Sequence, residues 1–134
     1  MTESFLGPLL RRRDGRVALH NARSGGLIAA TVLTAFESKG RRAGLLAYAS
    51  LPAGVAMVIA PSNAIHTFFM RFAIDVAFVA RDGRIVKTHR SLGPWRIAAA
   101  LGAYAVVELP AGTLARLDTV VGDRLVLVKE PAII

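Results

Sequence analysis

The chain has 134 residues, of which 54% are hydrophobic and 19% charged, a composition that excludes general disorder and fits one domain with a sizeable core. It contains no cysteine, which excludes disulfides, thiolate nucleophiles and cysteine-ligated zinc or iron–sulfur centres. Its net charge of +8 favours anionic partners such as nucleic acid or phosphate-bearing ligands. The plainer interpretation is that the charge only keeps an arginine-rich chain in solution.

The first 16 residues combine turn-forming residues with a run of arginines. Gly7-Pro8 and Asp14-Gly15 flank Arg11-Arg12-Arg13, and this composition predicts a mobile or loosely docked basic arm over 1–16. The Asp14-Gly15 pair is also typical of a hairpin turn before a strand. We expect a single domain over 17–134.

Residues 25–36 form an apolar run that allows two interpretations. With arginines before it, the run resembles the basic and apolar parts of a secretion signal, but Glu37-Ser-Lys-Gly-Arg-Arg follows where a small-residue cleavage site is expected. The apolar residues 27–33 favour a buried strand, which is our prediction. No run in the sequence reaches the ~18–20 apolar residues of a membrane span, so we expect no transmembrane segment and a cytoplasmic protein.

Thr34-Ala-Phe-Glu37 has the form of a capping box and predicts a helical segment that continues as far as Tyr48. Beyond it, apolar runs alternate with turn signals. The runs predicted to be strands cover residues 55–59, 64–72, 74–80, 85–91, 103–109 and 124–129. Asp82-Gly83 predicts a hairpin, residues 93–96 a loop, and Thr113 the start of one helical turn. Seven or eight short strands predict a mainly β (α+β) fold, a small antiparallel β-barrel or sandwich with one helical segment packed on it.

Four motifs stand in a fixed order between residues 41 and 128. They are Arg41-Arg-Ala-Gly-Leu-Leu46, His66-Thr-Phe-Phe-Met-Arg-Phe-Ala-Ile-Asp75, Arg81-Asp-Gly-Arg-Ile-Val86, and Val106-Val-Glu-Leu-Pro-Ala-Gly112 with Gly122-Asp123. In order and spacing they resemble the bacterial and archaeal family named domain of unknown function 192. The resemblance implies a small β-rich barrel similar to swapped-hairpin regulator barrels of the AbrB type, and it implies no established activity. Many members carry a leader, which makes an exported location the alternative.

The apolar run 64–78 is interrupted by four polar side chains, those of His66, Thr67, Arg71 and Asp75. Burying polar groups is unfavourable unless each finds a partner, so these residues either form a structural network or line a site. In one regular strand, Thr67 and Arg71 share a face, and Asp75 returns to Arg71 beyond a bend. The pair is then either an ion pair that holds the bend or an arginine fork for an anion. Phe69, Met70 and Phe72 are expected in the core.

His66 suits a general base or a metal ligand, but the other histidines lie far away in sequence and no Gly-x-Ser-x-Gly motif supplies a nucleophile. We therefore predict no catalytic residue, no metal and no cofactor. Trp95 stands on a Gly-Pro loop beside Arg96 and is either docked on the fold or exposed for stacking.

The sequence thus predicts a non-enzymatic binding module. Its candidate ligand-binding residues are His66, Thr67, Arg71, Asp75, Trp95 and Arg96. The expected ligand is a small anionic or polar molecule, or a segment of a partner protein, bound near the central strand. Edge strands also allow a homodimer. Two alternatives stay open, namely nucleic-acid binding through the arginine-rich surface and an enzyme of unknown class.

Overall fold

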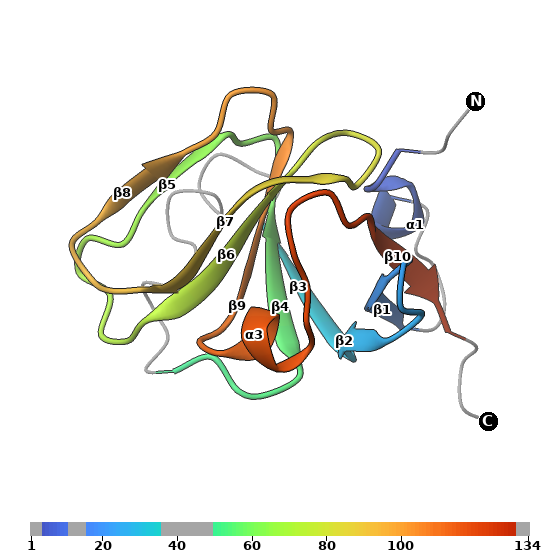
Figure 1. The fold of residues 1–134 in the computed structure, drawn as a ribbon, viewed down its shortest axis with the longest axis horizontal. Coiled ribbons are helices and arrows are strands. Elements are labelled where there is room, and N and C mark those ends of the chain that lie inside the picture. Colours follow the sequence, from blue (N-terminus) through green and yellow to red (C-terminus); the bar gives the residue numbers. More distant parts are fainter. Residues whose placement is uncertain (1–3, 11–15, 36–49, 131–134) are drawn as a thin grey trace.

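The computed structural model of the protein describes residues 4–10, 16–35 and 50–130, which form ten strands and two short helices (Figure 1). In chain order these elements are α1 (Gly7–Leu10), β1 (Val17–Asn21), β2 (Leu27–Ala29), β3 (Thr31–Ala35), β4 (Val55–Ile59), β5 (Ala64–His66), β6 (Ile74–Val79), β7 (Ile85–Leu92), β8 (Ile97–Ala99), β9 (Ala105–Pro110), α3 (Thr113–Arg116) and β10 (Leu125–Lys129). The predicted mainly β fold is confirmed, with more strands than the seven or eight expected.

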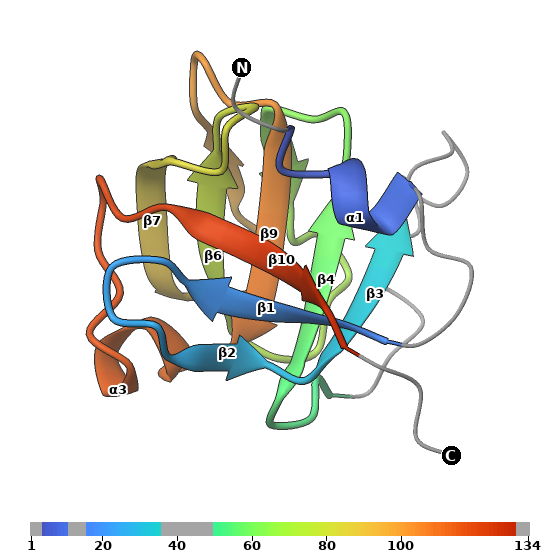
Figure 2. The same ribbon diagram turned by 90° about the vertical axis from the view of Figure 1, so that its right-hand side faces the viewer.

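The strands form three layers. A five-stranded sheet in the order β3-β4-β9-β6-β7 lies in the middle, and the three-stranded sheet β10-β1-β2 lies in front of it in Figure 2. The third layer is the two-stranded β5-β8 ribbon at the left of Figure 1. The strand pairs are antiparallel except β3 with β4, which is parallel. The described strands therefore stack as sheets and do not close into one barrel.

Side chains along the middle sheet alternate between two cores. The first core lies toward the three-stranded sheet and includes Leu19, Val58, Ala77, Val107 and Leu125. The second core lies toward the β5-β8 ribbon and includes Met57, Val76, Phe78, Ala98 and Val106. Because both faces of the middle sheet are covered, all six residues of β6 are buried. This double burial explains why the sequence of β6 is an almost continuous apolar run.

The predicted strand over 27–33 is in fact two strands, β2 and β3, which belong to different sheets. Thr34, the expected start of a helix, lies in β3. The rest of the expected helical segment, 36–48, lies outside the described residues. The described helices are instead α1 and α3, each of four residues.

Residues 4–10 of the expected basic arm are docked on the first core. Phe5, Leu6 and Leu9 are buried in it, and the backbone N–H of Phe5 donates to the carbonyl oxygen of Arg81 at 2.7 Å. Residues 11–15, with the expected Asp14-Gly15 turn, lie outside the described residues.

The Asp82-Gly83 hairpin is confirmed, because β6 and β7 pair antiparallel on either side of it. Gly83 has φ +91° and a Cβ there would collide with the backbone carbonyl oxygen of Leu125, so the position accepts only glycine. Across the three described stretches, no helix is long and apolar enough to span a bilayer.

Candidate functional site

The chain turns directly after β5, where the sequence predicted a strand as far as Phe72. The carbonyl oxygen of Thr67 accepts hydrogen bonds from the backbone N–H groups of Met70 at 3.2 Å and Trp95 at 3.0 Å, and Phe69 has φ +68°. The alternation of faces predicted for 64–72 is therefore wrong beyond His66. The turn brings residues after β5 beside the loop 93–96 that joins β7 to β8.

Thr67 connects these two loops from a fully buried position. Its hydroxyl donates to the carbonyl oxygen of Gly93 at 2.6 Å and accepts from the backbone N–H of Arg96 at 2.9 Å. Its own N–H donates to the carbonyl oxygen of Arg96 at 2.8 Å. Thr67 thus contributes to the candidate site by positioning the loops that carry the exposed residues.

The valine variant of Thr67 tests this positioning role. Valine keeps the shape but removes the hydroxyl, so two backbone groups lose their partner and the free energy of unfolding is expected to fall by about 2 kcal/mol. Urea denaturation of Thr67→Val measures the loss. The matched control is Thr88→Val on β7, whose hydroxyl bonds to none of the described residues, and we expect a change below about 0.5 kcal/mol there. Equal stabilities of the two variants would contradict the role.

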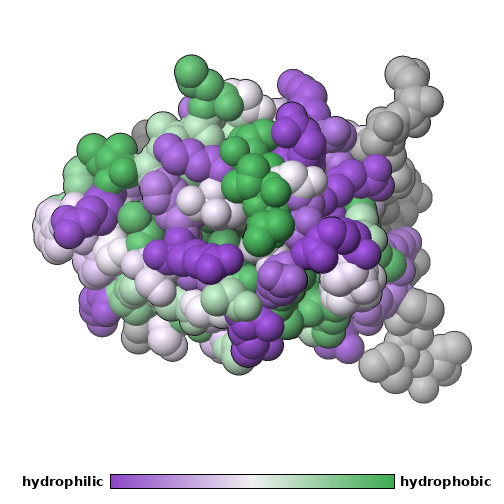
Figure 3. Space-filling view, in the orientation of Figure 1, coloured by the Kyte–Doolittle hydropathy of each residue, from purple (hydrophilic) through white to green (hydrophobic). Residues whose placement is uncertain are grey.

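Four rings form a continuous cluster on the two loops, three of them exposed and Phe68 half-buried, which we call the aromatic tip. The tip consists of His66, Phe68, Phe69 and Trp95, with ring centroids 4.9 Å apart for His66–Phe68, 5.8 Å for Phe68–Trp95 and 4.7 Å for Phe69–Trp95. Phe69 is 71% exposed and Trp95 57%. The loops lie at the far left of Figure 1, away from α1 and β10, and hydrophobic and hydrophilic side chains lie next to each other at that end in Figure 3.

The backbone at both of the most exposed rings is strained. Phe69 has φ +68° and Trp95 has φ +63°, a left-handed conformation that costs about 1–2 kcal/mol for residues other than glycine. Such strain persists only where the surrounding structure imposes it, and here both rings face solvent. Strained residues that persist at an exposed position point to a functional role.

Positive charge surrounds the tip. Arg71 and Arg96, on the same two loops as the rings, are exposed, and so is Arg90 near the end of β7. The exposed acidic residues of the described chain, Asp82, Asp118 and Glu130, lie outside these two loops. Asp82 follows Arg81, which bonds to Phe5, while Asp118 bonds to Arg23 and Glu130 to Arg16. The two loops of the tip therefore carry positive charge and no exposed carboxylate.

Asp75 is fully buried and does not meet Arg71. Its Oδ1 accepts from the backbone N–H of Ser91 at 2.8 Å, and its Oδ2 accepts from that of Leu114 at 2.8 Å. Both residues lie in the described part of the chain, where no ion pair joins Arg71 to Asp75. Asp75 instead fixes the end of β7 and the start of α3, so it supports the site from below the surface.

Two further titratable side chains lie in one row across the middle sheet, because Val76 stands opposite both Glu108 on β9 and His89 on β7. Burial raises the pKa of Glu108 to about 7, and burial together with Lys87 lowers the pKa of His89. Nε2 of His89 and Oε2 of Glu108 are buried without a partner among the described residues. Val76 separates the two groups, so they do not form an acid–base pair.

The remaining polar cluster fixes the loop before β10. Asp123 accepts from Nε of Arg23 at 2.7 Å, from the side-chain amide of Asn21 at 2.9 Å and from the backbone N–H of Val120 at 3.0 Å. The hydrogen bond from Arg23 holds the pKa of Asp123 well below its usual range. The carboxylate of Asp123 thus finds its hydrogen-bond donors within the cluster, which is typical of a structural network.

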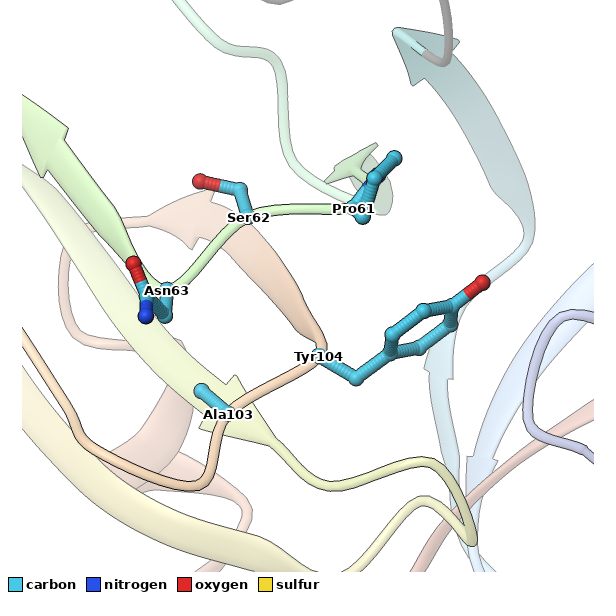
Figure 4. Close-up of a pocket in the computed structure, with 5 residues that line it drawn as sticks. All are labelled: Pro61, Ser62, Asn63, Ala103 and Tyr104. Atoms are coloured by element: carbon cyan, nitrogen blue, oxygen red, sulfur yellow. The ribbon is translucent and has the colours of Figure 1, made fainter.

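A shallow pocket of about 270 Å³ lies elsewhere among the described residues. Its lining consists of Pro61, Ser62, Asn63, Ala103 and Tyr104. The side chains of Ser62 and Asn63 point away from the Tyr104 ring in Figure 4, so the polar groups do not converge on one point. In the described stretches no group of three or more His, Cys, Asp or Glu residues could hold a metal ion.

Sequence reasoning found four of the exposed residues at this end of the molecule, namely His66, Arg71, Trp95 and Arg96. It placed Phe69 in the core together with Met70 and Phe72, and only the last two are there. Phe69 was missed because no glycine or asparagine marks the left-handed position that turns its ring outward.

The layers and the tip define a small β-sheet protein with an exposed aromatic and basic surface. The sequence model of the domain of unknown function 192 family, described as "Uncharacterized ACR", matches residues 19–127, and the chain belongs to this family. No curated protein matches the chain.

Two solved structures are similar to this one. A candidate transcription regulator from Sinorhizobium meliloti 1021 is 28% identical, with a TM-score of 0.74 over 84% of this chain and 92% of that chain. A protein of unknown function from Novosphingobium aromaticivorans DSM 12444 is 23% identical, with a TM-score of 0.70 over 81% of each chain, and shows the shared fold.

Proposed function

We propose that the protein is a non-enzymatic binding module that contacts its partner through the aromatic tip and the arginines beside it. His66, Arg71, Trp95 and Arg96 would touch the partner, while Thr67 and Asp75 hold the loops in place. The expected partner is a small anionic or polar ligand, or a segment of another protein. The observation that carries the proposal is the exposure of two touching rings, Phe69 and Trp95, on strained backbone.

Rings of this kind are effective contact groups. A Phe or Trp side chain buries about 150–250 Å² when a partner covers it, and Trp and Arg are enriched among the residues that dominate binding energy. The buried bonds of Thr67 fix the loops before any partner arrives. Less conformational entropy is therefore lost on binding than with a free loop.

Trp95 is the single tryptophan of the chain and reports directly on the tip. Titration with inorganic phosphate, nucleotides, oligonucleotides and acidic or neutral peptides is expected to change its emission for at least one of these ligand classes. The Phe69→Gly variant relieves the left-handed strain and removes one ring. We expect its free energy of unfolding to stay within about 1 kcal/mol of the wild type and its affinity to fall about tenfold, which is about 1.4 kcal/mol.

The matched control is Leu101→Ala, which removes a side chain that is 95% exposed and lies outside the tip. It should change neither stability nor affinity. A Trp95 emission that no ligand alters, or a Phe69→Gly variant that binds as tightly as the wild type, would overturn the proposal.

A further inference from the structure

We infer that the aromatic tip binds single-stranded nucleic acid, with bases stacked on Phe69 and Trp95 and phosphates held near Arg71 and Arg96. This inference rests on the function proposed above and names the class of ligand. It uses three features of the tip, namely its charge, its rings and the side chains that it lacks.

The charge around the tip has one sign. Residues 64–73 and 86–99, which build the tip and the strands beneath it, contain no Asp or Glu. Their basic and histidine side chains are His66, Arg71, Lys87, His89, Arg90 and Arg96. Asp75 follows the first stretch, but it is buried and both its oxygens accept backbone hydrogen bonds. A surface of this charge attracts a polyanion such as a nucleic-acid backbone.

The exposed rings suit unpaired bases. Every base has a flat face that stacks on an aromatic side chain, and proteins that bind single strands combine such rings with a basic surface. The rings of the tip touch one another at centroid distances of 4.7–5.8 Å, and the two most exposed of them, Phe69 and Trp95, are open to bases. The bases of a duplex are already stacked on each other, so they cannot stack on these rings. The described helices are four residues long, too short to read a major groove.

The tip also lacks the side chains that recognise adenine and cytosine, and its arginines, which read guanine in duplexes, are here assigned to phosphates. Asn and Gln read adenine, and Glu and Asp read cytosine, yet the stretches 64–73 and 86–99 contain none of them. We therefore expect binding that depends weakly on base sequence and strongly on salt.

The test is fluorescence anisotropy with labelled oligonucleotides of about 12 nucleotides, a length within the usual range of site sizes. An oligothymidine, an oligoadenosine and a duplex of the same length are titrated with the full-length protein at low and at moderate salt. We expect both single strands to bind and the duplex to bind at least tenfold more weakly. Phe69→Gly and Arg96→Ala should each weaken single-strand binding about tenfold.

Two variants serve as controls. Arg84→Ala removes an exposed arginine beside β10, at the other end of the molecule, and Leu101→Ala removes an exposed apolar side chain outside the tip. Neither should change the affinity. Circular dichroism and thermal melting of each variant establish that it is folded before the affinities are compared.

Equal affinity for duplex and single strand, with no effect of Phe69→Gly, would overturn the inference in favour of binding by the general basic surface. Vesicles of anionic lipid and an acidic peptide are titrated in parallel. If only one of these binds, and Phe69→Gly weakens it, the inference fails while the binding module stands. If no ligand binds through the tip, both the single-strand inference and the proposed binding function fail.

Discussion

Replacing Asp75 with alanine is expected to lower the free energy of unfolding by about 3–5 kcal/mol. The carboxylate is fully buried and accepts two backbone hydrogen bonds, from Ser91 and from Leu114, each at 2.8 Å. Gly112, the residue before α3, has no side chain with which to cap the helix, so Asp75 supplies the cap from a strand that is distant in sequence. The alanine variant leaves both N–H groups without an acceptor.

Urea denaturation of wild type, Asp75→Ala and Asp75→Asn measures this effect. Asparagine retains one acceptor oxygen, so we expect about half of the loss. The matched control is Asp82→Ala, because Asp82 accepts a single hydrogen bond, from the N–H of Arg84, at an exposed turn. Its expected loss is about 0.5–1 kcal/mol. If Asp75→Ala loses no more than Asp82→Ala, then Asp75 does not connect β7 to α3.

The parts of the fold that sequence predicts well depend on local signals. Asp82-Gly83 defines its hairpin because the turn needs a positive φ, and residues 74–79 form a strand whose apolar run reflects burial on both faces. The strand over 64–72 fails because its end is decided by contacts with Arg96 and Trp95, which are far away in sequence. Periodicity within one segment cannot report such contacts.

In the candidate site too, the sequence indicates what depends on local signals and misses what depends on contacts far away in sequence. The sequence found the polar residues of the motif because polar groups in an apolar run need an explanation. It paired Arg71 with Asp75 on the assumption that the two side chains meet, whereas the partners of Asp75 are backbone groups of β7 and α3. Backbone N–H groups occur at every residue except proline, so no pattern of side chains could have indicated them. The exposure of Phe69 likewise depends on a turn that Thr67 holds from inside.

Glu108 is expected to make the protein less stable as the pH rises. It lies on β9, opposite Met57 on β4 and Val76 on β6, and these neighbours belong to the second core. Burial there disfavours the charged form and raises the pKa to about 7. Because this value lies above that of the unfolded chain, the folded state holds the proton more tightly. The contribution of Glu108 to stability is largest below about pH 4.3 and falls until the pH exceeds 7, by about 3 kcal/mol in all.

Comparing wild type with Glu108→Gln isolates this effect. Glutamine stays neutral, so we expect the variant to be more stable than the wild type by about 3 kcal/mol at pH 8 and the difference to disappear near pH 4. Urea denaturation at each pH measures it, with the exposed Glu130→Gln as the control.

The shifted pKa values of His89 and Asp123 do not produce this fall in stability with rising pH. The lowered pKa of His89 acts in the opposite direction, because its stabilisation is lost as the pH falls below about 6.5. The low pKa of Asp123 matters only below about pH 4. Both contributions are common to the two proteins and cancel in the difference. A Glu108→Gln difference that is constant from pH 4 to pH 8 would mean that the carboxyl group stays ionised in the folded protein and that a cation compensates its burial.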